Sequence, residues 1–254
     1  MTKWICILLA SLALPAAAQT LVVAAASDMA TSIDELAAAF AREAPGAEVK
    51  TALGASGNLF AQIKNGAPFD VFMSADMAYP ARLAREGAAE GSTLQPYAVG
   101  RVVLWSADRR FDLRQGLRVL GDARLARLAI ANPDVAPYGH AARAALQAHG
   151  FWDTVKDKLV IGENVAQAAQ FVQTGNAQLG VVSYSTVLGP RMKGVGSYYL
   201  IPDDGAAPIE QGAIVTRKGQ GNALSGRFMQ FLQSPAARAI LLRHGFSIPR
   251  AKHA

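Results

Sequence analysis

Four short segments of the sequence place polar or aromatic side chains where an apolar run ends and a helical pattern begins. These segments are Ser27-Asp28, Ser56-Gly57-Asn58, Tyr138-Gly139 and Asn164-Val165. A helix N-terminus has free N–H groups and a partial positive charge, so it binds oxyanions without a cationic side chain. Ser, Asp and Asn are also common N-cap residues, which gives each segment alone a purely structural interpretation. The recurrence of this pattern four times favours a shared anion site.

Signatures of catalysis are mostly absent from the sequence. The segment from Gly54 to Asn58 departs from the G-x-S-x-G nucleophile elbow, because Asn58 replaces the second glycine. The four histidines, at positions 140, 149, 244 and 253, do not have the spacing of a metal site. The sequence also has no glycine-rich phosphate loop. We therefore expect a binding protein that needs no cofactor and is not an enzyme. An exported serine hydrolase with Ser56 as nucleophile is the distant alternative.

The elements that would position these segments alternate between strands and helices. Apolar runs predict strands at residues 21–26, 48–53, 69–74, 102–105, 128–131, 159–161, 179–182 and 213–215. Helical patterns fall at residues 33–40, 59–63, 78–85, 139–149, 165–173, 223–232 and 236–243. This order indicates an α/β fold in which helices cover both faces of parallel sheets. Because no long linker interrupts it, we expect two doubly wound lobes between which the chain crosses more than once.

The N-terminal segment, residues 1–18, has the three parts of a signal peptide. Lys3 precedes an apolar run over residues 4–14, and the small residues Ala16 to Ala18 follow it. The run is too short for a permanent membrane anchor. We expect export to the periplasm, with cleavage near Ala18 and a mature chain that begins at Gln19. The single cysteine, Cys6, lies in this segment, so the mature protein should contain no disulfide.

Composition excludes some classes of protein and leaves others open. The 254 residues are 51% hydrophobic and 17% charged, with a net charge of +6, so the chain can bury a sizeable core. The modest positive charge favours anions but selects none of them. Arginine is frequent between residues 101 and 127, at positions 101, 109, 110, 114, 118, 124 and 127. Export and the lack of a recognised motif favour a solvated surface there over nucleic-acid binding.

Several segments of the chain together resemble one protein family. In the first half they are residues 23–28, 54–59 (Gly-Ala-Ser-Gly-Asn-Leu) and 66–76. In the second half they are residues 131–133, 136–139, 162–165 (Gly-Glu-Asn-Val), 231–237 and 244–246. In this combination, from about residue 20 to residue 249, the sequence is similar to the periplasmic molybdate-binding proteins. These are the solute-binding components of ABC importers.

The resemblance implies a type 2 periplasmic binding protein with two lobes, a two-strand hinge and an anion site in the cleft. Lobe one would comprise residues 19–98 and 212–254, and lobe two residues 99–211. The expected ligand is molybdate or tungstate, and the expected macromolecular partner is the membrane permease of the importer. We expect a monomer that binds no nucleic acid.

Carried over by position, the resemblance also implies which residues bind the anion. Ser27 and Ser56 would offer hydroxyls and nearby amides from lobe one, and Asp28 would add its backbone amide. Tyr138 and Val165 would offer backbone N–H groups from lobe two. These groups are divided between the two lobes, so the resemblance predicts that closure brings them together.

One position departs from the family pattern. Where some members place a tyrosine hydroxyl on the anion, this sequence has Ser183, whose side chain is shorter. The neighbouring Tyr184 would point to the opposite face if the strand continued through it. Ser183 therefore has two interpretations, an anion contact or a serine at the end of a strand without a ligand.

Hydrogen bonding separates some candidate anions from others. Molybdate and tungstate are fully deprotonated at neutral pH, so they accept hydrogen bonds and donate none. Sulfate has the same charge and the same character, so only cavity size can exclude it. Hydrogen phosphate has a proton to donate and needs a buried acceptor, for which Asp28 is the one nearby carboxylate. An outward Asp28 would disfavour phosphate and an inward one would favour it. A sulfate or phosphate carrier is thus the alternative among binding proteins.

Overall fold

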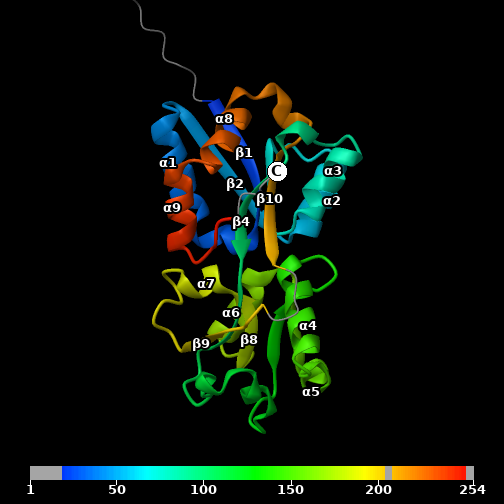
Figure 1. Cartoon of the computed structure of the whole chain (residues 1–254), viewed down its shortest axis with the longest axis vertical. Coiled ribbons are helices and arrows are strands. Elements are labelled where there is room, and N and C mark those ends of the chain that lie inside the picture. The colour runs from blue at the N-terminus through cyan, green and yellow to red at the C-terminus, as the bar shows by residue number, and fades with distance from the viewer. Residues whose placement is uncertain (1–18, 204–207, 250–254) are drawn as a thin grey trace, which may run out of the picture.

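Two five-stranded sheets, each with helices packed around it, make up the described part of the protein (Figure 1). The structure is a computed structural model that describes residues 19–203 and 208–249. The predicted signal segment, residues 1–18, lies outside these residues. We call each sheet with its helices a lobe.

The first lobe contains both the early and the late parts of the chain (Figure 1). Its sheet has the order β2-β1-β3-β10-β4. The strands are β1 (Gln19–Ala26), β2 (Ala47–Gly54), β3 (Val71–Ser74), β4 (Gln95–Gly100) and β10 (Ile209–Val215). Strands β1, β2 and β3 are parallel, whereas β10 runs antiparallel to both β3 and β4. The sheet is therefore mixed, and the expectation of a purely parallel sheet is wrong at β10.

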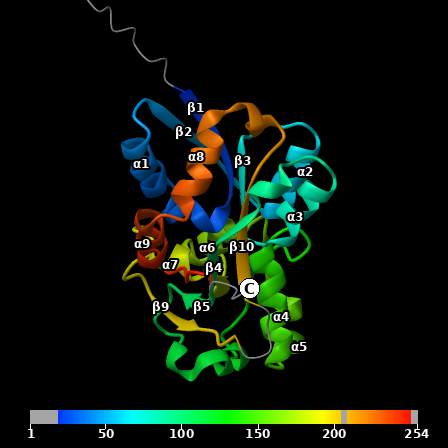
Figure 2. The same ribbon diagram turned by 45° about the horizontal axis from the view of Figure 1, so that its top comes forward.

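Helices cover both faces of the first sheet (Figure 2). Helices α1 (Ile33–Glu43), α8 (Ala223–Leu232) and α9 (Pro235–Arg243) pack on one face, and α2 (Ser56–Lys64) and α3 (Ala78–Arg85) pack on the other. The alternation of side chains along a strand divides β1 between these two cores. Leu21 and Val23 lie in the core with α1, while Ala24 lies in the core with α2. Such two-sided burial explains why β1 reads as a continuous apolar run.

The second lobe is built on the same plan from the middle of the chain. Its sheet has the order β7-β6-β8-β5-β9. The strands are β5 (Val102–Ser106), β6 (Leu128–Ala131), β7 (Leu159–Gly162), β8 (Leu179–Ser183) and β9 (Ser197–Leu200). Its helices are α4 (Pro137–Ala148), α5 (Trp152–Val155), α6 (Val165–Gln173) and α7 (Tyr184–Leu188). Strand β5 runs antiparallel to β8 and β9, and its Trp105 is fully buried in the core of this lobe.

The chain passes between the lobes where β4 leads into β5 and where β9 returns to β10 (Figure 1). Only Arg101 separates β4 from β5. Short helices complete the connections: η1 (Ser27–Thr31), η2 (Gly91–Thr93), η3 (Leu113–Gly121), η4 (Lys156–Lys158) and η5 (Lys218–Gly221). Throughout residues 19–203 and 208–249, no helix has the length and apolar character needed to cross a bilayer.

The predicted α/β fold with two doubly wound lobes is confirmed. Helices α3, α6 and α8 have the predicted bounds, and every predicted strand is present. The sequence pattern missed β4 and β9, and it placed the start of β10 four residues too late. Strand β9 is largely exposed, and Gln95-Pro96 opens β4 with residues that are uncommon in strands, so neither has an apolar run to reveal it.

Candidate functional site

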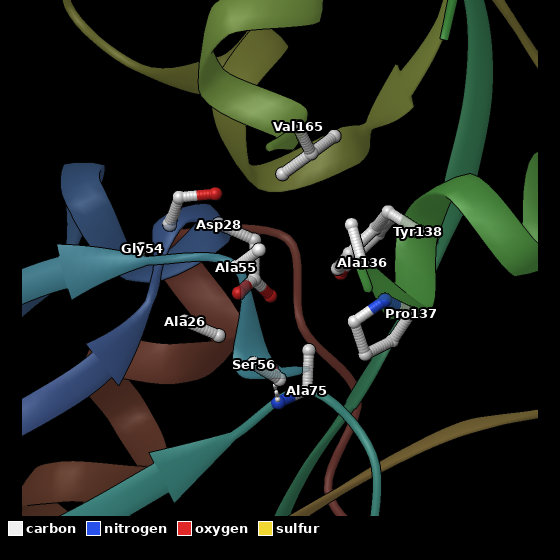
Figure 3. A pocket seen from close by; sticks show the side chains of 11 residues that line it. Ala26, Asp28, Gly54, Ala55, Ser56, Ala75, Ala136, Pro137, Tyr138 and Val165 are labelled. Atoms are coloured by element: carbon white, nitrogen blue, oxygen red, sulfur yellow. Dashed lines mark hydrogen bonds between the residues drawn. The ribbon is translucent and has the colours of Figure 1, made fainter. Parts of the chain in front are cut away.

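The residues predicted to bind an anion meet in one small pocket between the lobes (Figure 3). It is lined by Ala26, Ser27, Asp28, Gly54, Ala55, Ser56, Ala75, Ala136, Pro137, Tyr138 and Val165. Figure 3 shows Asp28 and Ser56 on one wall, with Tyr138 and Val165 on the opposite side. The cavity volume is about 10 Å³, roughly the space that one water-sized sphere occupies. The walls are therefore close together, and the lobes must part for a larger ligand to enter.

Each predicted site segment lies at the start of a helix. Ser27 is the first residue of η1, Ser56 the first of α2, and Val165 the first of α6, while Tyr138 is the second residue of α4. All four residues are at most 5% exposed. The four helix N-termini therefore direct their positive ends toward one point, which favours negative charge there.

Three of these helices begin after an alanine, which cannot cap them. Within the described chain, the N-cap residues Ala26, Ala55 and Ala136 provide no side-chain hydrogen bond to their helices. An alanine in place of a capping residue costs about 0.5–2 kcal/mol. The interpretation of Ser27 and Ser56 as N-caps is therefore wrong, because both lie inside the first helical turn. Uncapped first turns leave backbone N–H groups available for a ligand.

Helix α6 differs from the other three because a side chain caps it. Asn164 is its N-cap residue, and Oδ1 of Asn164 accepts 3.1 Å hydrogen bonds from the backbone N–H groups of Ala166 and Gln167. The amide of Val165 does not take part in this cap. Asn164 therefore holds the first turn in place and leaves the N–H group of Val165, a residue that lines the pocket, outside the cap.

The Ser56 hydroxyl has a defined orientation. Its Oγ accepts a hydrogen bond of 3.0 Å from the backbone N–H of Ala75. Because this bond uses an oxygen lone pair, the hydroxyl proton remains available to donate into the pocket. The next residue, Gly57, donates its backbone N–H across the cleft to the carbonyl oxygen of Val135 at 2.9 Å. A Cβ atom at position 57 would lie 2.8 Å from that same oxygen.

The Asp28 carboxyl forms part of the pocket wall and belongs to a buried hydrogen-bond network. Its Oδ2 accepts a 2.5 Å hydrogen bond from Nε2 of Gln211, which also donates to the Tyr138 hydroxyl at 3.3 Å. Oε1 of Gln211 accepts a 2.6 Å bond from the Tyr97 hydroxyl. Burial raises the pKa of Asp28 to about 6, against the opposing effect of its hydrogen bond from Gln211. Burial also raises the pKa values of Tyr97 and Tyr138, so both hydroxyls remain neutral.

Ser183 is placed outside the pocket lining. It is the N-cap residue of α7, and its Oγ lies 2.5 Å from Oγ1 of Thr186. Ser185 donates its hydroxyl to Ser183 at 3.2 Å and to the carbonyl oxygen of Asp28 at 2.9 Å. Strand β8 ends at Ser183, so the strand alternation used to orient Tyr184 does not apply. The Tyr184 ring instead packs under the Arg101 guanidinium, 4.7 Å from the ring centroid.

The pocket offers hydrogen-bond donors but no cationic side chain. None of its described lining residues is Lys, Arg or His. Such a site holds an anion through N–H and O–H dipoles rather than through ion pairs, and charge-assisted hydrogen bonds of this kind are about twice as strong as neutral ones. The lining also provides no histidine beside Ser56 that could act as the base of a hydrolase.

Sequence reasoning missed three residues that support this site: Tyr97, Gln211 and Ser185. Tyr97 belongs to the unpredicted strand β4, and Gln211 lies in the part of β10 that precedes the predicted start. Ser185 connects the lobes through a backbone carbonyl, a contact that no residue type reveals. Neighbours in sequence do not indicate any of these partners, because each bond joins segments more than 100 residues apart.

Two α/β lobes that share a pocket of helix N-termini define a two-lobed solute-binding protein. The chain belongs to the family of bacterial extracellular solute-binding proteins, whose pattern matches residues 21–247.

Individual relatives are similar over nearly the whole chain. The sequence is 40% identical to the molybdate-binding protein ModA of Rhodobacter capsulatus over 239 residues, which are 94% of this chain and 92% of the relative. The structure is similar to the periplasmic molybdate-binding protein of Azotobacter vinelandii, with a TM-score of 0.85 and 34% identity over 91% of this chain and 100% of that one. It also resembles the sulfate-binding protein SubI of Mycobacterium tuberculosis H37Rv in fold, with a TM-score of 0.75 and 14% identity over 93% and 88% of the two chains.

Proposed function

We propose that this protein is the solute-binding component of an ABC importer and that it binds molybdate, with tungstate as a second ligand. The observation that carries this proposal is the convergence of four helix N-termini from both lobes on one buried pocket without a cation among its described residues. Relatives named for molybdate binding, at 40% and 34% identity, support the choice of anion. The permease of the importer is the membrane partner.

The proposed ligand set divides between the lobes. Ser27 and Ser56 donate their hydroxyls and Asp28 its backbone amide from the first lobe, while Tyr138 and Val165 donate backbone N–H groups from the second. Each of these residues lines the pocket. Ser183 is the exception among the predicted ligand residues. We place it in a supporting role, because its hydroxyl is engaged by Thr186 and Ser185 instead of lining the pocket.

Closure of the two lobes is the proposed mechanism of binding. We propose that the lobes divide near residues 98 and 212, inside β4 and β10, so that these two strands form the hinge beside the pocket. A ligand drives closure only if it interacts better with the closed form. Donors on both sides of the cleft meet this condition, because one anion reaches both sets only when the lobes approach. The bond from Gly57 to Val135 would then form on closure.

Selection among anions follows from size and from proton content. Sulfate is smaller than molybdate, so at least one donor should lie beyond hydrogen-bond reach when sulfate binds. Hydrogen phosphate is the stronger competitor, because the Asp28 carboxyl points inward and offers a buried acceptor. The relatives named for molybdate favour molybdate over phosphate. A phosphate or sulfate carrier therefore remains the second candidate.

We propose that the protein has no catalytic activity and acts as a monomer, since one chain supplies all the proposed ligand groups. Nucleic-acid binding by the arginine-rich stretch is disfavoured because three of its arginines are paired with aspartates. The pairs are Arg110 with Asp108, Arg114 with Asp112, and Arg124 with Asp122. The protein acts in the periplasm after cleavage near Ala18. Sequencing the N-terminus of exported material tests the cleavage, and a chain that still begins with Met1 would refute it.

Titration calorimetry tests the proposed ligand. The anions are molybdate, tungstate, sulfate and phosphate, with single-stranded DNA as a further arm. We expect nanomolar binding of molybdate and tungstate, equivalent to about −12 kcal/mol, and much weaker binding of the other two anions. Small-angle scattering should show a more compact protein with molybdate than without it. Equal affinity for sulfate or phosphate would replace the molybdate assignment with a general oxyanion carrier.

A further inference from the structure

We infer that Asp28 takes up a proton from solvent when a dianion enters the pocket, so that anion binding is coupled to proton binding. The inference rests on the proposed function, because it concerns the same pocket. The starting observation is the fully buried carboxyl of Asp28, which lies among the hydrogen-bond donors proposed to bind the anion. Figure 3 shows this carboxyl among the side chains that line the pocket.

The hydrogen-bond network fixes which carboxyl oxygen can carry the proton. The Tyr97 hydroxyl donates to Oε1 of Gln211, so the amide of Gln211 must direct its Nε2 toward Asp28. Oδ2 of Asp28 then accepts from an N–H group and cannot donate to it. Within the described chain, Oδ1 of Asp28 is buried without a hydrogen-bond partner. A proton on Asp28 therefore belongs on Oδ1.

An anion in the pocket would give Oδ1 the partner that it lacks. An ionised Asp28 has only acceptor oxygens, so two acceptors, Oδ1 and an anion oxygen, would face each other without a proton between them. Protonation converts Oδ1 into an O–H donor, and a fully deprotonated dianion can accept from it. The same proton removes the repulsion between the carboxylate and the dianion, which is strong at a site away from water.

Among the described residues, no charged side chain faces Asp28 to offset this repulsion. The titratable groups that face it are the hydroxyls of Tyr97 on β4 and Tyr138 on α4, and both stay neutral. Strand β1 and helix α6, which pack against η1, contain no titratable residue. The ring of Tyr184 in α7 packs against the Arg101 guanidinium. Other charged or titratable side chains belong to the elements that pack against η1 or that contribute a hydrogen-bond partner to the Asp28 network. All of them lie at the surface or are partly exposed: Asp34, Glu35, Arg42, Glu43, Glu48, Lys50, His140, Arg143 and Glu210.

The coupling predicts a specific dependence of affinity on pH. Burial already holds the pKa of Asp28 at about 6 in the ligand-free protein, and a neighbouring dianion would raise this pKa further. Below pH 6, Asp28 is already protonated in the ligand-free protein, so its titration should not change the affinity for the anion. Above pH 6 the proton must be taken up, so Kd should rise by up to about tenfold per pH unit.

The test is calorimetry with molybdate and with sulfate from pH 6.5 to 8.5, in buffers of differing ionisation enthalpy. We expect Kd to rise with pH, and we expect proton uptake to approach one proton per anion at the upper end. The change in binding enthalpy with the ionisation enthalpy of the buffer gives the number of protons taken up per anion, and this number does not depend on the fitted Kd. A Kd that is constant over this range, with no proton uptake, would overturn the inference.

The decisive variant is Asp28→Asn, whose amide reproduces the protonated carboxyl. Its carbonyl oxygen can accept from Gln211, and its NH₂ group can donate where Oδ1 stands. We expect Asp28→Asn to bind molybdate with a Kd that is independent of pH, about tenfold or more tighter than wild type at pH 8. Asp34→Asn, at an exposed carboxylate of α1, should keep the pH dependence of the wild type.

The outcomes separate the inference from the proposed function. If Asp28→Asn retains the pH dependence of the wild type, the proton resides elsewhere and the inference is wrong. Sulfate binding as tight as molybdate binding, with the expected proton uptake, would refute the molybdate assignment and support the coupling. A folded protein that binds neither anion at any pH would refute both.

Discussion

The backbone N–H of Ala75 donates a 3.0 Å hydrogen bond to the hydroxyl oxygen of Ser56, which leaves the hydroxyl proton free to donate to a ligand in the pocket. Ala75 follows β3 and Ser56 opens α2, so two elements of the first lobe cooperate to orient one donor. Because the bond from Ala75 occupies one side of the oxygen, the hydroxyl proton has fewer directions open to it before the ligand arrives. Pre-orientation of a donor increases affinity because less freedom is lost on binding.

Replacing Ser56 by Ala should weaken molybdate binding and leave the fold intact. The change removes one charge-assisted hydrogen bond, which contributes about 1.5–3 kcal/mol, or roughly a 10- to 150-fold change in Kd. Calorimetry measures the change. Ser225→Ala is the matched control, because Ser225 is equally buried but lies in α8, outside the pocket lining. An unchanged Kd in a folded Ser56→Ala protein would remove Ser56 from the site.

Replacing Gly57 by Ala should hinder closure rather than folding. The new Cβ would lie 2.8 Å from the carbonyl oxygen of Val135 in the other lobe, and 2.9 Å from the Tyr79 hydroxyl, which is the far end of a side chain in its own lobe. Overpacking of this kind costs about 1–3 kcal/mol, which predicts roughly 5- to 150-fold weaker molybdate binding.

The control for this change is Gly226→Ala, at a helical glycine where a Cβ meets no atom within 4 Å. Melting temperatures of the ligand-free variants should equal or exceed that of the wild type, because alanine favours a helix over glycine. Wild-type affinity in Gly57→Ala would show that the lobes do not approach at this point when the anion binds.

The Asp28 carboxyl should lower the stability of the ligand-free protein as pH rises. Its pKa is about 6 in the folded state, against 3.8 as the usual value. The unfolded chain therefore ionises first, and the folded state loses stability between pH 3.8 and pH 6. The loss is about 2–3 kcal/mol, and it persists at higher pH.

Urea unfolding of wild type and Asp28→Asn at pH 4, 6 and 8 measures this effect. The stability of the variant relative to the wild type should increase by about 2–3 kcal/mol from pH 4 to pH 8. Subtracting the two curves removes the contributions of groups that the proteins share. A difference that does not vary with pH would show that Asp28 ionises normally in the folded protein.

Much of the fold could be predicted because the strands are buried on both faces and therefore appear as apolar runs. Residues 21–26 and 128–131 are examples, and each lies between two other strands of its sheet. The polar and exposed strand β9 has no such pattern, so it could not be identified. The antiparallel direction of β5 and β10 depends on which strands pair, which local sequence does not encode.

The candidate site was predictable to the extent that helix starts carry a local signal. Ser27, Ser56, Tyr138 and Val165 all line the pocket, as their places at helix N-termini indicated. The direction of the Asp28 side chain could not be predicted from the local sequence, because it depends on a hydrogen bond from Gln211, which lies 183 residues further along the chain. The place of Ser183 as the N-cap of α7 depends on where strand β8 ends, and the apolar pattern does not mark that point.

Crystals of the protein grown with molybdate, measured at the molybdenum absorption edge, test the central claim most directly. The anomalous difference map locates the metal independently of any assumption about the ligand. We predict a single strong peak in the pocket between Ser56 and Val165, within hydrogen-bonding geometry of donors from both lobes. A peak elsewhere on the protein, or no peak in crystals of folded protein at saturating molybdate, would contradict the account.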